Sequence, residues 1–264
     1  MVDDSTNNNQ LKVFFRKCLH FVSERIPSEC PICEMPVSGR RLCCQCQQSI
    51  QPLKQHCFIC AEPLFLGSPN YSIPKQLHTT THQLCCGRCL KHPPAFDSTL
   101  VASLYQEPLV QLIKKLKFHE NLGISPILGA LLSQRISNAQ QFDQLSLPQA
   151  LVAVPLHKNR LHQRGYNQAE LIARYLSKQL QIPLLKNAVI RVLNTHDQAT
   201  FNLQQRMKNM KGAFKVLKDI PKHIAIVDDV ITSGSTCHEL SRMLKKSGAE
   251  IVDVYAVAKT PLNK

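Results

Sequence analysis

Two adjacent aspartates, Asp228 and Asp229, follow a short apolar run in the stretch IAIVDDVITSGST. The run has the length and composition of a buried parallel strand, and the carboxyl ends of such strands form the ligand-binding edge of an α/β sheet. Two neighbouring carboxylates at that edge can accept hydrogen bonds from a cis-diol, and one of them can reach a hydrated Mg²⁺. These residues therefore indicate a site for a sugar diol.

A small loop follows the strand and leads directly into a helix. Its residues are Thr232, Ser233, Gly234, Ser235 and Thr236. Backbone N–H groups, hydroxyls and the positive end of a helix dipole together hold a phosphate, and glycine permits the tight turn. The diacid and this loop in sequence describe a site for a ribose 5-phosphate. An ordinary strand-to-helix turn with a hydroxyl N-cap is the structural alternative.

Four cysteine pairs share the spacing CxxC, in which both thiolates of one turn can bind one ion. They are Cys30/Cys33, Cys43/Cys46, Cys57/Cys60 and Cys86/Cys89. Two such turns complete a tetrahedral Cys₄ zinc site. Sequential pairing, with the first four cysteines on one zinc and the last four on another, is the simplest arrangement, and the spacing leaves crossed pairing open. With four protein ligands no position remains for a substrate water, so both zinc ions are expected to be structural.

Neighbouring side chains leave some freedom in this ligand assignment. Cys44 and Cys85 adjoin the pairs and can replace a neighbour, and three histidines are close enough in sequence to do the same: His56, His78 and His82. The two other cysteines, Cys18 and Cys237, lie on apolar faces of expected helices and are interpreted as buried thiols.

Three regions are expected to position these groups. Residues 1–26 read as a polar tail and an amphipathic helix, which either packs on the neighbouring domain or lies on a membrane surface. Residues 27–95 are rich in cysteine and proline and poor in periodicity, so metal must organise them. Residues 96–264 alternate apolar strands with amphipathic helices. We expect strands at 96–105, 150–155, 184–192, 223–229 and 250–259, and helices at 109–116, 125–136, 167–180, 204–210 and 235–248. This alternation predicts an α/β fold with a mainly parallel sheet flanked by helices.

The overall composition favours an anionic partner. The 264 residues carry a formal charge of +14 and remain basic even with eight zinc-bound thiolates. Nucleic acid, an anionic membrane surface or a polyphosphate substrate would suit such a chain. No apolar run approaches the roughly 18 residues that a membrane span needs. The N-terminal stretch MVDDSTNNNQ lacks the pattern of an export signal. We therefore expect a cytoplasmic protein.

Four motifs in this order resemble the ComF/GntX family. The stretch IAIVDDVITSGST resembles the PRPP-binding motif of type I phosphoribosyltransferases, and VPLHKNRLHQRGYNQAE is similar to the family's pyrophosphate loop. The third motif is Thr195, Gln198, Asn202, Arg206, Asn209, Ala213 and Phe214. The fourth is the cysteine-rich module followed by PPAFDSTLVASLYQEPLVQLIKKLKF. The resemblance spans about residues 28–260.

The resemblance implies a type I phosphoribosyltransferase-like fold behind a small N-terminal zinc module. It assigns Asp228 and Asp229 to the ribose hydroxyls of PRPP, directly or through Mg²⁺, and residues 232–236 to its 5-phosphate. Pyrophosphate would meet three cations of the loop after the strand at 150–155, unless these form a solvated basic loop: Lys158, Arg160 and Arg164. Arg191 and Arg206 would flank a segment that closes over the site.

The family also implies a role in the handling of incoming single-stranded DNA during natural transformation, with a DNA-translocating helicase and recombination mediators as partners. The basic charge suits DNA, although only 6% of the residues are aromatic. Two alternatives stay open. One is a working phosphoribosyltransferase whose acceptor no motif identifies. The other is a zinc-dependent DNA-binding scaffold with a vestigial site.

Overall fold

The computed structural model describes residues 27–39, 41–64, 84–143, 145–193 and 209–262. The chain divides into two compact units, Met1–Ile50 and Gln51–Lys264. The amphipathic helix expected before residue 26 lies outside the described residues. The domain boundaries drawn from the sequence, at 26/27 and 95/96, stay a prediction.

The described part of the first unit is a small cysteine-bearing turn structure. Strand β1 (Pro27–Glu29) pairs with β2 (Pro36–Ser38) in an antiparallel hairpin, and helix α2 (Cys44–Ser49) follows. The connection between the strands closes with a hydrogen bond from the N–H of Cys30 to the carbonyl of Met35 at 2.9 Å. Such short elements bury few side chains, which fits a fold organised by its cysteines.

The second unit is built on a parallel four-stranded sheet. Its strands are β3 (Ser98–Leu104), β8 (Ile251–Lys259), β7 (His223–Ile231) and β4 (Ala150–Ala153), hydrogen-bonded in the order β3-β8-β7-β4. The two central strands, β7 and β8, are apolar on both faces, as strands covered on both sides must be. The predicted α/β fold with a parallel sheet is confirmed.

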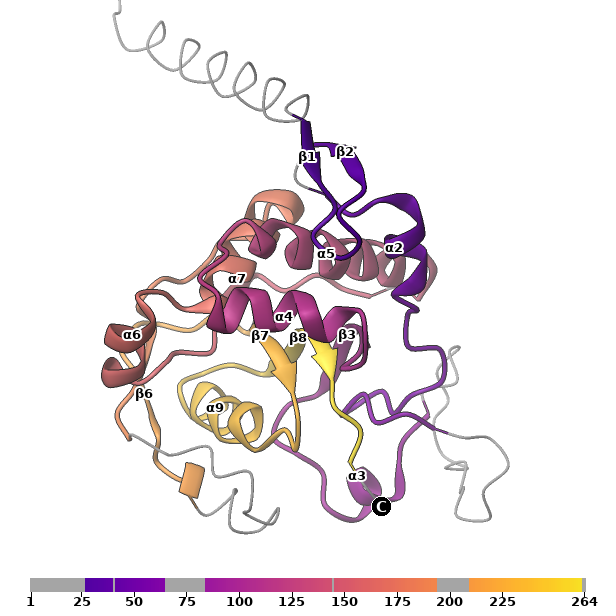
Figure 1. Ribbon diagram of the computed structural model, residues 1–264. Coiled ribbons are helices and arrows are strands. Elements are labelled where there is room, and N and C mark those ends of the chain that lie inside the picture. Colours follow the sequence, from indigo (N-terminus) through magenta and orange to yellow (C-terminus); the bar gives the residue numbers. More distant parts are fainter. Residues whose placement is uncertain (1–26, 40, 65–83, 144, 194–208, 263–264) are drawn as a thin grey trace, which may run out of the picture. The chain divides into compact units, whose positions relative to one another are not determined.

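Helices cover both faces of this sheet (Figure 1). Helices α5 (Ile124–Phe142) and α7 (Gln168–Leu180) lie side by side on one face. Helix α9 (Ser235–Lys246) packs on the other face, where Leu240 and Leu244 join Ile226 and Val254 in one apolar cluster. Helix α4 (Leu109–Phe118) follows β3 and contacts α5.

The second pair of CxxC turns belongs to this unit and shares its core. Cys57, Cys60 and Cys89 are buried in the same apolar cluster as Phe96 of the following segment and Leu240 of α9. Cys89 lies in the short helix α3 (Gly87–Lys91). These cysteines are therefore part of the packing of the α/β unit.

Two local elements differ from the sequence prediction. The stretch expected to be a basic loop after β4 forms the short helix α6 (Lys158–Arg164). The strand expected over residues 184–192 is only β5 (Val189–Arg191), which pairs antiparallel with β6 (Phe214–Val216) instead of joining the central sheet. The helix expected at 204–210 falls mostly outside the described residues.

Among the described residues, no helix combines the length and the apolar character that crossing a membrane would require.

Candidate functional site

The two aspartates lie in the second half of β7 and diverge to the two faces of the sheet. Because side chains alternate along a strand, Asp228 lies on the face of α9, where its charge acts on the buried thiol of Cys237. Asp229 lies on the opposite face and is 7% exposed. Oδ1 of Asp228 accepts a hydrogen bond from the N–H of Asp229 at 2.8 Å, which holds the first carboxylate against the backbone.

Lys117, at the end of α4, neutralises the second aspartate. Its Nζ lies 2.8 Å from Oδ2 of Asp229, and both side chains are largely buried. Burial opposes the charge on Lys117, but the carboxylates of Asp229 and Asp228 raise its pKa. The sequence analysis missed this residue, because the apolar period of its helix says only that Lys117 lies off the buried face.

The electrostatic environment of Asp228 perturbs its pKa strongly. Burial, followed by the charge of Asp229, raises the pKa of Asp228 to about 7, although Lys117 and Arg191 act in the opposite direction. Such a group binds a proton or a cation near neutral pH. A carboxylate oxygen is also a ligand that Mg²⁺ prefers, so the residue type and its surroundings fit a magnesium ion.

The loop after β7 has the geometry of a tight turn into a helix. Gly234 adopts φ +78° and is the N-cap residue of α9, and a side chain at this position would approach the ring of Phe96 to 3.5 Å. The hydroxyls of Ser233 and Ser235 lie 3.0 Å apart, and the N–H of Ser235 points to Oγ of Ser233. Thr232 is exposed, and Ser233 and Thr236 are partly so. Hydroxyls, backbone N–H groups and a helix N-terminus therefore converge on one small region that suits a phosphate.

A fully buried lysine supports this loop from the neighbouring strand. Lys259, the last residue of β8, is 0% exposed. Its Nζ donates to the carbonyl of Thr232 at 3.1 Å and to that of Thr260, and lies 3.0 Å from Oε2 of Glu62. Glu62 follows the Cys57–Cys60 turn, and its own carbonyl accepts from the N–H of Cys57 at 2.8 Å. The ion pair thus joins the second cysteine cluster to the loop after β7.

The predicted pyrophosphate residues that the structure describes fall on two elements. Lys158, Arg160 and Arg164 all lie on α6, which begins at the cap residue His157 and ends at Gly165. Arg191, at the end of β5, is 9% exposed, and its guanidinium lies 5.9 Å from the ring of Phe214. A bridge between His157 and Arg191 links the two elements. Arg206, and with it the third family motif apart from residues 209–214, lies outside the described residues.

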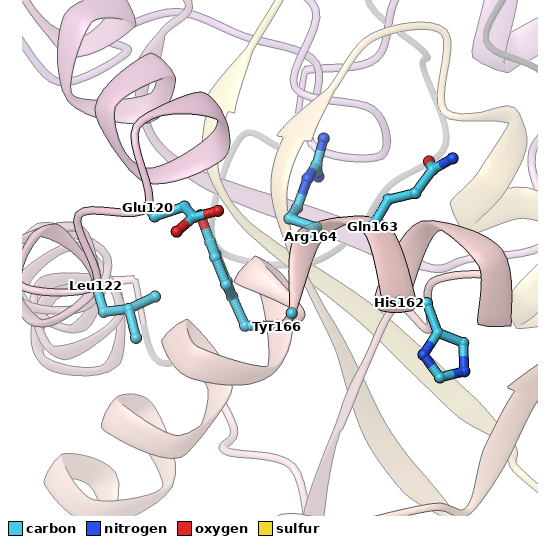
Figure 2. Close-up of a pocket in the computed structure, with 7 residues that line it drawn as sticks. Glu120, Leu122, His162, Gln163, Arg164 and Tyr166 are labelled. Carbon is cyan, nitrogen blue, oxygen red and sulfur yellow. The ribbon is translucent and has the colours of Figure 1, made fainter.

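A cavity of about 370 Å³ lies between α6 and the connection from α4 to α5 (Figure 2). Its lining comprises Glu120, Leu122, His162, Gln163, Arg164, Gly165 and Tyr166. Tyr166 donates a hydrogen bond to the carbonyl of Leu116, which fastens this wall to α4. Arg164 lies with its guanidinium 5.9 Å from the ring centroid of Phe118, the residue next to Lys117. The α6 cations are thereby placed next to the end of α4 that binds Asp229.

The eight predicted zinc ligands gather in two groups of four. Cys30, Cys33, Cys43 and Cys46 form one group, and Cys57, Cys60, Cys86 and Cys89 form the other; within each group all sulfurs lie within 4.8 Å of one another. Tetrahedral ligation at a Zn–S distance of about 2.3 Å requires sulfurs about 3.8 Å apart. The Cys33–Cys43 and Cys60–Cys86 sulfurs, at 3.5 and 3.7 Å, meet that requirement. Both groups can therefore hold a structural zinc ion, and the pairing is the sequential one.

The alternative ligands that fall within the described residues do not belong to these groups. Cys44 is exposed, Cys85 is partly buried, and His56 takes no part in either cluster of the described residues. His78 and His82 lie outside the described residues. The prediction that Cys237 is a buried thiol is confirmed at 2% exposure.

The four thiols of the second group lie close enough to shift one another's pKa values. Hydrogen bonds from the thiols of Cys57, Cys60 and Cys89 lower the pKa of Cys86, whereas the same kind of contact, from Cys57 first, raises the pKa of Cys89. One thiolate can be stabilised by its neighbours, but four require a cation. A divalent ion bound by all four supplies that charge and ties residues 57–60 to residues 86–89.

These features define a class of protein. It is a parallel α/β unit with a diacid and hydroxyl-loop site at one sheet edge, and with two four-cysteine clusters of the structural zinc type. No model of a known protein family matches the chain. Individual relatives do. The chain is 40% identical to Competence protein F of Haemophilus influenzae over 178 residues, 66% of this chain and 78% of that one. It is 32% identical to DNA utilization protein YhgH of Escherichia coli over 238 residues, 89% of this chain and 98% of that one.

A more distant relative carries a related name. Over 156 residues, 59% of this chain and 65% of the other, the sequence is 22% identical to Competence protein ComFC of Streptococcus pneumoniae. The extent and identity of the first two matches show the relationship. The chain belongs to the ComF family.

Proposed function

We propose that this protein acts in DNA utilization, in the cytoplasmic handling of incoming single-stranded DNA, and that it binds PRPP with Mg²⁺ at the carboxyl end of β7. The first part follows the names of its relatives, two of which are called competence proteins and one a DNA utilization protein. The second part rests on the site. The observation that carries it is the succession of a diacid, a hydroxyl loop and the N-terminus of α9 within thirteen residues of one strand end.

Each part of PRPP has a matching group. Asp228, on the α9 face together with the loop, would accept the ribose hydroxyls and contribute an oxygen to Mg²⁺. Residues 232–236 would hold the 5-phosphate through hydroxyls and backbone N–H groups. Asp229 would act through Lys117, whose ammonium it fixes at 2.8 Å. The pyrophosphate would then lie toward Lys117, Arg191 and the α6 cations, since fork-shaped guanidinium groups suit it.

A working transferase is the second candidate, and the pKa of Asp228 favours it. If a nucleophile attacks C1 of the ribose, the C1–oxygen bond to pyrophosphate breaks and the acceptor loses a proton. A carboxyl with a pKa of about 7 is matched to accept that proton at neutral pH when no cation is bound to it. Mg²⁺, when bound, would neutralise charge on the departing pyrophosphate. Release of pyrophosphate from PRPP in the presence of an amine or nucleobase acceptor would support this candidate.

Calorimetric titration with PRPP and Mg²⁺ tests the ligand. We expect heat of binding for the wild-type protein and its loss in the Asp228→Asn/Asp229→Asn variant. The matched control is Glu170→Gln, which removes an exposed carboxylate paired only with Arg174 on α7 and should leave binding unchanged. Absence of heat in the wild-type protein would refute the PRPP proposal.

Transformation or DNA-utilization assays then separate a role that depends on PRPP from a zinc-dependent scaffold. A role that depends on PRPP is lost in the Asp228/Asp229 variant. A zinc-dependent scaffold with a vestigial site, in contrast, retains its function in that variant and loses it when Cys86 is replaced. Co-purification with a DNA-translocating helicase or a recombination mediator would identify the partners, and capture that is independent of DNA would count as a direct contact.

A further inference from the structure

We propose that the surface formed by Phe118, Leu122, His162, Arg164 and Tyr166, here called the Phe118 surface, binds single-stranded DNA, with a base stacked on Phe118. This inference rests on the DNA-handling part of the proposed function and assigns it to residues. It is independent of whether the neighbouring site binds PRPP.

Phe118 has the exposure and the support of a stacking platform. The side chain of this last residue of α4 is 67% exposed. Much of the side chain is therefore open to a ligand from solution. The guanidinium of Arg164 lies 5.9 Å from the ring centroid and approaches it from α6. A cation at this distance is attracted to the face of the ring, so Phe118 and a positive charge lie together at this surface.

The charge around the ring matches a phosphate backbone. Helix α6 carries Lys158, Arg160, His162 and Arg164 and contains no acidic residue. An arginine that packs its face on an aromatic ring still presents the N–H groups along its edge, and these can bind a phosphate. Among the residues that line the cavity, Glu120 is the one carboxylate, and Figure 2 shows it beside Tyr166 and away from His162. Phosphates would therefore follow α6, and the base would enter on the α4 side.

The apolar and aromatic parts of the surface favour a single strand over a duplex. The bases of a duplex are already stacked on one another, whereas those of a single strand are free to stack on a side chain. Leu122, 47% exposed, and Tyr166 line the cavity of about 370 Å³, and Arg164 of the same lining lies over the ring of Phe118. A duplex would use the α6 cations alone and gain nothing from the ring.

The position of the surface links the DNA to the site on β7. Lys117 and Phe118 are consecutive, yet the first pairs with Asp229 and the second faces the solvent. A strand bound on Phe118 therefore lies next to the end of α4 that reaches the diacid. The last turn of α4 would therefore take part in both events, in DNA binding through Phe118 and in PRPP binding through Lys117.

The absence of tryptophan from the chain permits a direct test. Phe118→Trp places a single tryptophan in the surface, and we expect its fluorescence to be quenched when a deoxythymidine oligomer is added, with affinity close to that of the wild-type protein. Phe142, on α5, is 71% exposed, so Phe142→Trp is the matched control and should show no quenching. Equal quenching of the two tryptophans, no quenching of either, or equal quenching by duplex and single strand would overturn the proposal.

Replacement by alanine gives the size of the effect. Loss of one stacked base should weaken single-strand binding about 5- to 100-fold in Phe118→Ala. The dependence of affinity on salt should stay unchanged, because no phosphate contact is removed. Phe142→Ala should bind as the wild-type protein does. If the wild-type protein binds no single strand at low salt, the DNA part of the proposed function fails. If it binds and Phe118→Ala binds equally well, only the present inference fails.

Discussion

Replacement of Lys259 by methionine should destabilise the α/β unit by about 3 kcal/mol. Lys259 is completely buried and lies 3.0 Å from a carboxylate oxygen of Glu62, whose side chain is 18% exposed. Methionine fills similar volume but leaves the carboxylate buried without its cation. Breaking a buried ion pair in this way costs about 3–5 kcal/mol. The residual exposure of Glu62, and its remaining hydrogen bond from the N–H of Leu262 at 2.9 Å, favour the lower value.

Thermal unfolding with zinc present would measure this effect. A loss of about 3 kcal/mol corresponds to a fall in Tm of roughly 6–12 °C for a unit of this size. The matched control is Lys222→Met, which breaks the Lys222–Glu250 pair; its atoms are 2.6 Å apart, but its side chains are 69% and 66% exposed. Exposed pairs contribute about 0–1 kcal/mol, so the control should unfold close to the wild-type temperature.

A double variant separates the unpaired charge from the other consequences of losing the lysine. Glu62→Gln combined with Lys259→Met removes the stranded carboxylate and should recover part of the stability lost in Lys259→Met alone. The bond from Lys259 to the carbonyl of Thr232 is still missing, so affinity for PRPP should remain reduced. A Tm of Lys259→Met as high as that of Lys222→Met would refute the reasoning, because it would mean that Glu62 needs no cation.

Three further predictions follow from the site. The pKa of Asp228 in the folded protein is about 7, above its ordinary value. Between about pH 4 and pH 7 the folded protein therefore keeps a proton on Asp228 that the unfolded chain has lost, and the free energy of unfolding falls as the pH rises through this range. In denaturant titrations, Asp228→Asn should therefore gain stability relative to the wild-type protein over that range and keep a constant advantage at higher pH. Cys60→Ser should release zinc and lower the Tm of the α/β unit, because Cys60 belongs to the core of that unit. Cys30→Ser should release zinc but leave the Tm of the α/β unit unchanged. Elemental analysis measures the zinc content and calorimetry measures the Tm. Gly234→Ala should cost about 1–2 kcal/mol at φ +78° and weaken PRPP binding in isothermal titration, while Gly87→Ala, at a position with open space around it, should do neither.

The parallel sheet and the loop after β7 could be predicted because local sequence determines them. The run IAIV is apolar at every position, as a strand buried on both faces requires, and α9 begins where a glycine and hydroxyl residues permit a turn. Helix α6 could not be found in this way. Its one apolar residue, Leu161, is 42% exposed, so no amphipathic period exists. Local signals were nevertheless present: His157 caps the first turn, and Gly165 ends the helix at φ +72°.

The partners of buried charges could not be predicted, since the fold brings them together from distant parts of the sequence. Lys117 was one of three lysines off the apolar face of its helix, and only the packing of α4 determines that it meets Asp229. Lys259 ended an expected strand, and nothing in the sequence connected it with Glu62. The same reason applies to the pairing of β5 with β6, which the sequence did not predict. It also applies to the cysteine groups, whose sequential pairing only the fold determines. The spacing of residues in the sequence restricts which side chains can meet, but only the three-dimensional fold determines which of them do.

The parallel register explains why these charges meet at one edge. Lys259 is aligned with Leu104 at the end of β3 and with Ile231 at the end of β7. The segments after the strands must then leave from the same edge. Helix α4 after β3 and helix α6 after β4 bring cations to it, the loop after β7 brings hydroxyls, and β8 itself ends there in Lys259. The diacid places two carboxylates at an edge that also carries the cations of α4 and α6. An anionic ligand can therefore bind there once a proton or a cation has neutralised Asp228, and its affinity should depend on Mg²⁺ most steeply above pH 7, where that carboxyl is ionised.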